Sequence, residues 1–156
     1  MVRCYNFDVV FAEIPGETTL ALNISGCPNR CPGCHSPHLQ GDTGRELDEA
    51  ELRMLLDRYG GSVTCLCFMG GDAAPHEIVR LAECVRRLQP GLRTGWYSGR
   101  DEWPEGLRIG VFDYVKLGRW RAERGPLSAP TTNQRLYRVH ADGTTEDITE
   151  RFRRKP

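Results

Sequence analysis

The sequence lacks a long hydrophobic segment and has no excess of charge of either sign. Its most apolar stretch is residues 63–69, with a threonine among them, whereas a membrane-spanning helix needs about 20 apolar residues. Lys and Arg number 21, as do Asp and Glu, so the formal net charge is zero. We therefore expect no membrane span. We also expect no nucleic-acid partner, because general binding to a phosphate backbone favours a basic protein.

Several familiar motifs are missing as well. There is no phosphate-binding P-loop and no spaced-glycine dinucleotide fingerprint. The pair His76–Glu77 lacks the second histidine of a zinc protease motif, because Arg80 occupies that position. Asp8 and Glu13 interrupt the apolar core that a secretory signal would need. These absences weigh against phosphoryl and hydride transfer and predict a cytoplasmic protein.

Cysteine is abundant, with seven residues in the chain. An odd number cannot form a complete disulfide framework, and in a reducing compartment cysteines favour metal binding or catalysis. Cys27, Cys31 and Cys34 are three thiols within eight residues, separated by prolines and a glycine that prevent a regular helix. We interpret this segment as a loop wrapped around a metal centre.

Thiolate ligands select either an iron–sulfur cluster or zinc. A [4Fe-4S] cluster normally takes four cysteines, so three would leave one iron open to a substrate. The alternative is a structural zinc site completed by His35 or His38, in a non-enzymatic module that binds another protein. Structural zinc usually stabilises a chain with a small core. Two amphipathic helices and several apolar strands favour the cluster here.

Hydrophobic periodicity predicts an α/β fold with a mostly parallel sheet. The alternation of apolar residues and a continuous apolar run predict the first strands, and the i, i+3, i+4, i+7 stripe predicts helices. Asp48 is suited to cap the first helix, with Glu51 three residues later, and Pro15–Gly16 to form a turn. The predicted elements are strands at 5–11, 18–25 and 63–69, and helices at 48–59 and 75–88.

The second half of the chain predicts fewer regular elements. We expect strands at 92–98 and 111–117, a short helical turn around 101–105, a loop at 118–133, a hairpin at 134–148 and a solvated basic tail at 151–155. Alternating strands and helices predict a parallel sheet. We expect a single domain over 1–156, with an N-terminal hairpin (4–25), a cluster loop (26–40) and a C-terminal hairpin and tail (134–156).

A second candidate feature follows the buried strand, where Gly70, Gly71 and Asp72 stand in a row. Ligands of parallel sheets bind outside the carboxyl ends of the strands, and glycine lets the backbone approach a ligand closely. Asp72 would offer acceptor oxygens to an ammonium group. The alternative is an ordinary strand-to-helix turn. The remaining cysteines, Cys4, Cys65, Cys67 and Cys84, are interpreted as apolar filler.

The three thiols are spaced C-x3-C-x2-C, which resembles the mark of the radical S-adenosylmethionine superfamily. Within it, segments 23–27, 31–34, 70–72, 96–99 and 132–135 together resemble the activating enzymes of anaerobic ribonucleoside-triphosphate reductase, over roughly residues 5 to 140. Many superfamily members carry an aromatic residue where this chain has Gly33. The resemblance implies a partial (incomplete) β/α barrel of mostly parallel strands.

The resemblance also implies cofactors and their binding residues. A [4Fe-4S] cluster would be held by Cys27, Cys31 and Cys34, with the amino and carboxylate groups of S-adenosyl-L-methionine on its open iron. The residues implied near that cofactor are Gly70, Gly71 and Asp72 at the ammonium, Gly33, Cys34 and His35 at the adenine, and Ser98 at the ribose or carboxylate. An ordinary strand-end turn is the alternative role of Ser98.

The implied activity is reductive cleavage of S-adenosylmethionine to a 5'-deoxyadenosyl radical, which takes hydrogen from one glycine of the reductase. The reductase would be the protein substrate, and an external donor such as a flavodoxin-type protein would supply the electron. Loop 118–133 and residues 133–135 are candidates for docking or a cofactor contact, and an ordinary surface loop is the alternative. Alternatives are an activator of pyruvate formate-lyase type and a small-molecule radical enzyme.

Overall fold

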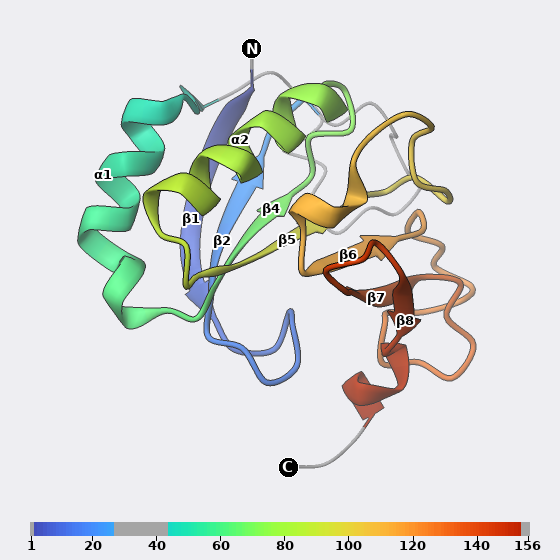
Figure 1. The fold of residues 1–156 in the computed structure, drawn as a ribbon. Coiled ribbons are helices and arrows are strands. Elements are labelled where there is room, and N and C mark those ends of the chain that lie inside the picture. Colours follow the sequence, from blue (N-terminus) through green and yellow to red (C-terminus); the bar gives the residue numbers. More distant parts are fainter. Residues whose placement is uncertain (1, 27–43, 154–156) are drawn as a thin grey trace.

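The computed structural model describes residues 2–26 and 44–153 around an eight-stranded mixed sheet (Figure 1). The strand order is β3-β1-β2-β4-β5-β6-β7-β8, so β3 and β8 lie at the two edges and the sheet is not closed. The strands are β1 (Arg3–Val10), β2 (Thr19–Ile24), β3 (Arg45–Glu46), β4 (Cys65–Met69), β5 (Arg93–Tyr97), β6 (Tyr114–Leu117), β7 (Arg135–Val139) and β8 (Thr145–Asp147). The predicted α/β class is confirmed.

Four neighbouring strands, β2, β4, β5 and β6, run parallel, and the outer strands pair with them or with each other antiparallel. The four strands therefore begin side by side at one end of the sheet and finish side by side at the other end. We call the end where they begin the amino edge and the end where they finish the carboxyl edge. The carboxyl edge is where ligands of parallel sheets bind.

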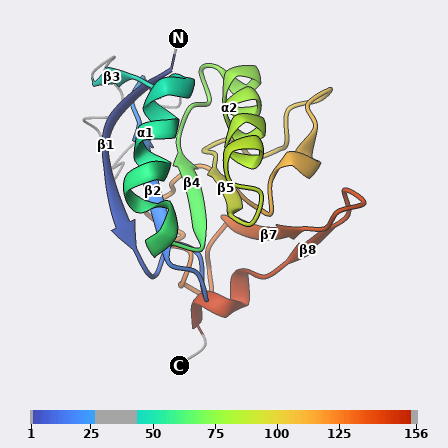
Figure 2. The same cartoon turned by 60° about the vertical axis from the view of Figure 1, so that its left-hand side comes forward.

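Two helices, α1 (Glu49–Tyr59) and α2 (Pro75–Leu88), cover one face of the sheet (Figure 2). The Asp48 side chain accepts a 2.9 Å hydrogen bond from the Glu51 N–H, which confirms the predicted cap. Pro75 is the first residue of α2, where its missing N–H costs no helical bond. The buried stripes of both helices join the larger hydrophobic core, including Leu52 and Ile78 at 0% exposure.

The other face of the sheet carries a smaller core, built around Ile14, Cys65, Cys67, Tyr114, Leu136 and Ile148. Cys65 and Cys67 are fully buried, and burial raises the pKa of both thiols. Cys84 lies in the larger core, and Cys4 packs against it, with a pKa raised to about 11 by burial and by Glu51. Burial bears out the interpretation of Cys65, Cys67 and Cys84 as apolar filler, whereas Cys4 is partly buried and donates to the Asn6 carbonyl.

Three expectations about the second half of the chain are wrong. Residues 101–105 form a bend and the start of a turn but no helix, and a 3-10 turn, η3, lies at Ile109–Val111. The strand expected from 111 begins only at Tyr114, because the chain first forms the turn η3. The expected solvated tail holds only in part: residues 151–153 belong to the 3-10 turn η4 (Thr149–Arg153), in which Arg151 and Arg153 are exposed but Phe152 packs against the smaller core.

The remaining boundaries agree with the sequence to within a few residues. The strand predicted to include Phe11 ends at Val10, and the Phe11 side chain is 72% exposed. The β7–β8 hairpin and the turn around Gly143 lie as predicted. The chain continues from α1 into the 3-10 turn η2 (Gly60–Ser62). Neither helix in the described part of the chain has the length and apolar character to span a bilayer.

Candidate functional site

The chain leaves β4 through Gly70, Gly71 and Asp72, and it leaves β5 through Ser98. The register pairs Met69 with Tyr97, so these two exits lie side by side at the carboxyl edge. The sequence prediction that the glycine pair follows a buried parallel strand is confirmed. The two sequence features that the resemblance linked to S-adenosylmethionine are neighbours in space.

The backbone angles and the close packing of this turn both favour glycine at positions 70 and 71. Their φ angles are 107° and 95°, a region that other residues rarely adopt. A Cβ on Gly70 would lie 3.1 Å from the Ile24 carbonyl oxygen, and one on Gly71 would lie 2.5 Å from Ile78 Cδ1. The turn is therefore packed between the end of β2 and the helix α2, and a larger residue at either position would force its neighbours to shift.

The backbone of this turn is anchored to β5 and α2. The Gly70 N–H donates to the Tyr97 carbonyl at 2.9 Å, and the Gly70 carbonyl accepts from the Trp96 indole N–H at 2.6 Å. The Gly71 carbonyl accepts from the Ala74 N–H at 3.0 Å. A carbonyl oxygen has two lone pairs, so each of these carbonyls keeps capacity for a second donor.

Asp72 is the centre of a buried hydrogen-bond network. Its side chain is 1% exposed, and its two carboxylate oxygens accept from the Ser98 hydroxyl at 2.6 Å and from the Gly99 N–H at 2.8 Å. The Asp72 carbonyl accepts from the Arg100 guanidinium at 2.9 Å, and the Ser98 hydroxyl also accepts from the Arg100 N–H at 3.1 Å. The segment after β5 is thus tied to the segment after β4.

Sequence reasoning treated Asp72 and Ser98 as separate contacts and missed Arg100. The structure brings Asp72 and Ser98 together as partners of each other. Arg100 lies three residues beyond the end of β5, and in the sequence it resembles any surface arginine, so the sequence carries no signal for its bond to Asp72. The predicted contacts of Asp72 and Ser98 with a cofactor remain predictions.

The predicted cluster ligands Cys27, Cys31 and Cys34 lie outside the described residues, as do Gly33 and His35. Their roles remain predictions. Within residues 2–26 and 44–153, no group of three or more His, Cys, Asp or Glu side chains is arranged to hold a metal ion.

A buried lysine near the end of β6 is a second feature that sequence reasoning missed. Lys116 is 7% exposed, and its ammonium donates to the Gly118 carbonyl at 2.9 Å and to Gln134 Oε1 at 3.0 Å. It also lies 5.5 Å from the centre of the Tyr97 ring, which allows a cation–π contact. These bonds hold together the two ends of loop 118–133.

A cavity of about 900 Å³ opens beside that loop. Its wall includes Phe11, Pro15, Tyr97, Leu127, Arg151 and Phe152. The Tyr97 hydroxyl donates to the Glu13 carbonyl, which holds the β1–β2 connection over the sheet. Tyr97 directly precedes Ser98, so the cavity borders the chain segment that leads into the carboxyl edge.

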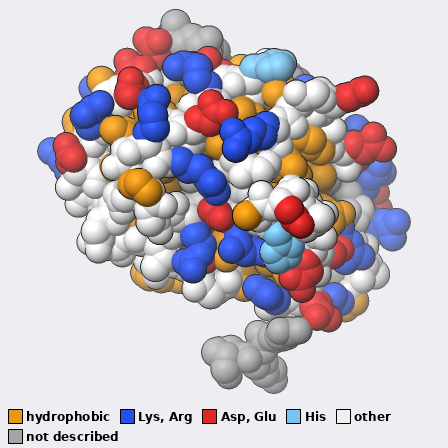
Figure 3. Space-filling model, viewed as in Figure 1, with side chains coloured by type: hydrophobic (Ala, Val, Ile, Leu, Met, Phe, Trp, Pro, Cys, Tyr) orange, Lys and Arg blue, Asp and Glu red, His pale blue; other side chains and the backbone are white. Residues whose placement is uncertain are grey.

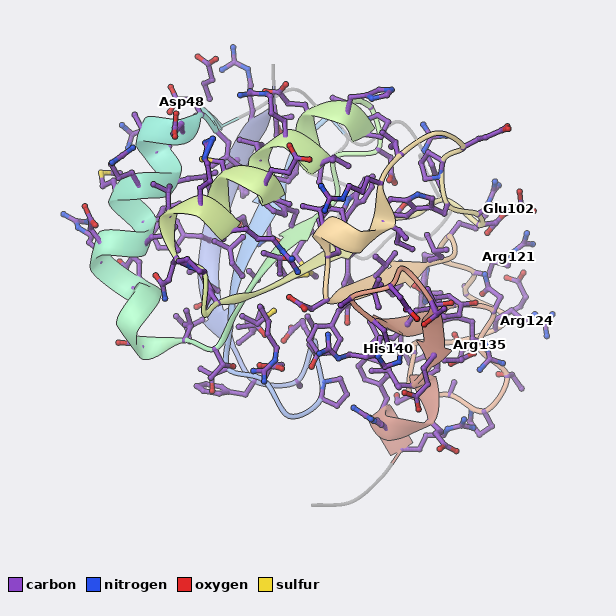
Figure 4. The ribbon with its side chains drawn as sticks, viewed as in Figure 1. Asp48, Glu102, Arg121, Arg124, Arg135 and His140 are labelled. Atoms are coloured by element: carbon purple, nitrogen blue, oxygen red, sulfur yellow. The ribbon has the colours of Figure 1, made fainter. Side chains whose placement is uncertain are left out.

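Charged side chains of both signs are interspersed over the face shown in Figure 3, in keeping with a formal charge of zero. Arg121 and Arg124 project from loop 118–133 on the same side of the molecule as Arg135 at the start of β7 (Figure 4). Arg135 lies 3.7 Å from Asp147, so part of this basic charge is matched by a nearby carboxylate.

No family model and no solved structure matches the chain. Among curated proteins, the chain is similar to Dicer-like protein 2-2 of Aspergillus niger, at 27% identity over 110 residues. That match covers 68% of this chain and 8% of the Dicer-like protein, so the chain spans less than a tenth of the length of this relative. A likeness of this extent assigns the chain to no family.

Proposed function

We propose that the protein is a radical S-adenosylmethionine enzyme that installs a glycyl radical on an anaerobic ribonucleoside-triphosphate reductase. The observation that carries this proposal is a convergence at the carboxyl edge. The end of β2, which leads into the cysteine segment, packs against Gly70 so closely that an added Cβ would lie 3.1 Å from the Ile24 carbonyl oxygen. Gly70–Asp72 and Ser98 meet at the same edge. Three segments that resemble the activating enzymes are thus neighbours.

The four parallel strands support the finer fold proposal, a partial β/α barrel. In such an arrangement the cluster loop follows the first parallel strand, and the next two strands supply the glycine turn and Ser98. This is the order in which β2, β4 and β5 lie in the sheet. The antiparallel strand β7 then limits the parallel series to four strands.

The residues at this edge suit the amino acid part of S-adenosylmethionine. The Gly70 and Gly71 carbonyls each keep one acceptor site for an ammonium group. Cys27, Cys31 and Cys34 would hold the [4Fe-4S] cluster, and Gly33, Cys34 and His35 would border the adenine. When bound, the cluster and S-adenosylmethionine supply the radical chemistry. The chain itself binds and orients the cofactor and keeps water out.

The cavity beside Tyr97 supports a protein substrate. Its volume of about 900 Å³ and its aromatic wall suit a peptide segment of a partner, and part of that wall comes from the predicted docking loop 118–133. We propose that the target segment of the reductase enters here and that a flavodoxin-type protein delivers the electron. We place this activity in the cytoplasm, where reducing conditions keep thiols available to a cluster.

Metal analysis of anaerobically purified protein tests the cluster. We expect about four iron and four sulfide per chain, with a brown colour. Cys31→Ala should lose most of both, whereas Cys4→Ala, which removes a thiol packed beside the larger core, should keep them. One zinc per chain and no colour would contradict the proposal and support the protein-binding zinc module.

Electron paramagnetic resonance then tests the partner. Reduced, cluster-loaded protein with S-adenosylmethionine should produce a glycyl radical on the anaerobic ribonucleotide reductase and none on pyruvate formate-lyase. A radical on pyruvate formate-lyase alone would identify the other class of activator. Cofactor cleavage without a radical on either protein would indicate a small-molecule substrate.

A further inference from the structure

Loop 118–133, which connects β6 to β7, is a compact loop whose two ends lie side by side. A Cβ on Gly118 would lie 2.9 Å from Gln134 Cα, and the Asn133 side-chain amide donates to the Arg119 carbonyl at 3.1 Å. Compact loops with adjoining ends are frequently functional. The loop is therefore a preformed part of the surface.

Hydrogen bonds within the loop also fix its outer turn, residues 121–124. The N–H groups of Arg124 and Gly125 donate to the Arg121 carbonyl at 3.0 and 3.1 Å, and the Thr131 hydroxyl donates to the Arg124 carbonyl at 2.7 Å. The backbone is held in this way although both arginines are exposed. A surface that is ordered before it binds loses less conformational freedom on binding, so this turn is suited to recognition.

The charge of these two arginines is not neutralised within the described part of the chain. Neither Arg121 nor Arg124 forms an ion pair with a carboxylate there, and the same holds for Arg151 in the wall of the cavity. The carboxylates in the outer turn and the cavity wall are Glu123 and Glu13. Arginines thus outnumber carboxylates, and this surface suits a partner of negative charge.

The same loop supplies part of the wall of the apolar cavity. Residues 126–128 line one part of it, and Phe152 lines another. Phe11, which also lines the cavity, is 72% exposed, more than any other large apolar side chain in the described residues. An exposed apolar surface bordered by charged residues is typical of a site of protein–protein interaction.

We propose that the outer turn of loop 118–133 and the cavity together bind an acidic, apolar segment of the reductase. This inference rests on the proposed function and adds the chemistry of the segment that enters the cavity. A large apolar side chain of that segment would cover Phe11 and Leu127, and carboxylates beside it would pair with Arg121 and Arg124. An arginine can hold a carboxylate through two parallel hydrogen bonds, so these contacts select for the position of the carboxylate as well as for its charge.

A nucleic acid is the rival partner, because arginine also pairs with phosphate. The apolar part of the cavity wall offers nothing to a phosphate backbone, and the chain as a whole has no basic surplus. These two observations favour the protein segment.

The rate of radical formation on the reductase tests the inference. Cluster-loaded protein, S-adenosylmethionine and a chemical reductant are mixed with increasing amounts of the reductase, and electron paramagnetic resonance follows the glycyl radical. In the double variant Arg121→Gln/Arg124→Gln, we expect the reductase concentration that gives half the maximal rate to rise roughly tenfold, because two charged contacts are lost. Phe11→Ser should raise it by a similar factor. The maximal rate should stay unchanged in both.

The matched control is the double variant Arg53→Gln/Arg58→Gln, which removes the same charge from exposed arginines of α1, across the sheet from the cavity. It should leave the half-saturating concentration and the maximal rate unchanged. All the substituted residues are exposed, so each variant should fold, and the urea midpoint of each should match that of the wild type.

Four results would overturn the inference. An unchanged half-saturating concentration in the Arg121→Gln/Arg124→Gln variant would show that the loop does not contact the reductase. A loss seen only when a flavodoxin-type protein replaces the chemical reductant would assign the loop to the electron donor. An RNA oligonucleotide that binds the wild type but not this variant, with normal reductase kinetics, would assign the loop to a nucleic acid. A wild-type protein that forms no radical on the reductase would overturn the proposed function as well, and this result is seen before any variant is compared.

Discussion

A buried carboxylate stands at each edge of the parallel strands, but the two carboxylates have different partners. At the carboxyl edge, Asp72 accepts from a hydroxyl and from a backbone N–H. At the amino edge, Glu17 accepts only from side chains among the described residues: Thr64 and Tyr114 donate at 2.6 Å, and Arg93 at 3.4 Å. Glu17 is 8% exposed and joins the β1–β2 connection to β5, β6 and the residue before β4.

The difference shows that a buried carboxylate serves a different purpose at each edge. Side-chain partners hold whole elements together, so the Glu17 network stabilises the sheet. Backbone partners fix the path of the chain, so the Asp72 network sets the shape of the edge at which ligands of parallel sheets bind. Changes at the amino edge should therefore affect mainly stability, whereas changes at the carboxyl edge should affect stability and binding together.

Two glycine substitutions should show the largest contrast between the edges. Gly71→Ala places a Cβ 2.5 Å from Ile78 Cδ1 at a φ of 95°, and we expect a loss of about 3 kcal/mol from backbone strain and overpacking. Gly16→Ala has a φ of 85° and nothing within 4 Å, so about 1 kcal/mol should be lost. Urea denaturation measures both. Equal losses would show that the glycine turn is not tightly packed.

Glu17→Ala should lower the free energy of unfolding by about 2 kcal/mol, because the Tyr114 hydroxyl, on a residue that is 5% exposed, loses its acceptor. Adding Tyr114→Phe should restore part of the loss, since the unpaired hydroxyl is then absent. Chemical denaturation of the single and double variants checks this. A Glu17→Ala variant that lost cofactor affinity at unchanged stability would contradict the proposed division between the edges.

The smallest effect is a decline of stability at alkaline pH. Burial raises the pKa of the Cys65 and Cys67 thiols, and burial together with Glu17 raises the pKa of Tyr114. The folded state therefore keeps protons that the unfolded chain releases. The contribution of these groups to stability should be constant below about pH 8.5, the ordinary thiol pKa, and fall above it, more steeply above about pH 10 where tyrosine ionises.

Variants separate the contributions of individual groups to this decline. Cys67→Ala should reduce the first part of the decline, which Cys4 and Cys65 share, and Tyr114→Phe should reduce the part above about pH 10, which Tyr97 shares. Ser98→Ala at the carboxyl edge should change neither part. The denaturation midpoint in urea, measured for each variant across this pH range, shows how much of the decline remains. A midpoint that did not change up to pH 10 would contradict the assignment of the thiols to a dry core.

Much of the fold could be predicted because local patterns and burial agree. Asp48 caps α1 as its spacing to Glu51 indicated, and the run ending at Met69 is a strand buried in the sheet. The predictions that are wrong concern segments whose structure depends on tertiary contacts. Val111 and Phe112 continue an apolar pattern, but Val111 belongs to the 3-10 turn η3, so the strand starts only at Tyr114. Phe152 lies in a basic segment, yet the smaller core holds it.

The candidate site could be predicted only in part. The rule for parallel sheets places Gly70–Asp72 and Ser98 at one edge from sequence alone. The bond between Asp72 and Ser98 depends on the register of β4 and β5, which no local pattern specifies. Lys116 was missed because a lysine near a strand end usually reaches solvent, and its acceptor Gln134 lies 18 residues further along the chain.

The reversal of direction between β6 and β7 has an architectural consequence. A further parallel strand would have needed a crossover, usually a third helix, to return the chain to the start of the sheet. By running back along β6, β7 adds width to the sheet without adding a helix. The face of the sheet opposite α1 and α2 is instead covered by two segments from opposite ends of the chain. One is the turn that carries Ile14, and the other is the stretch that carries Ile148 and Phe152.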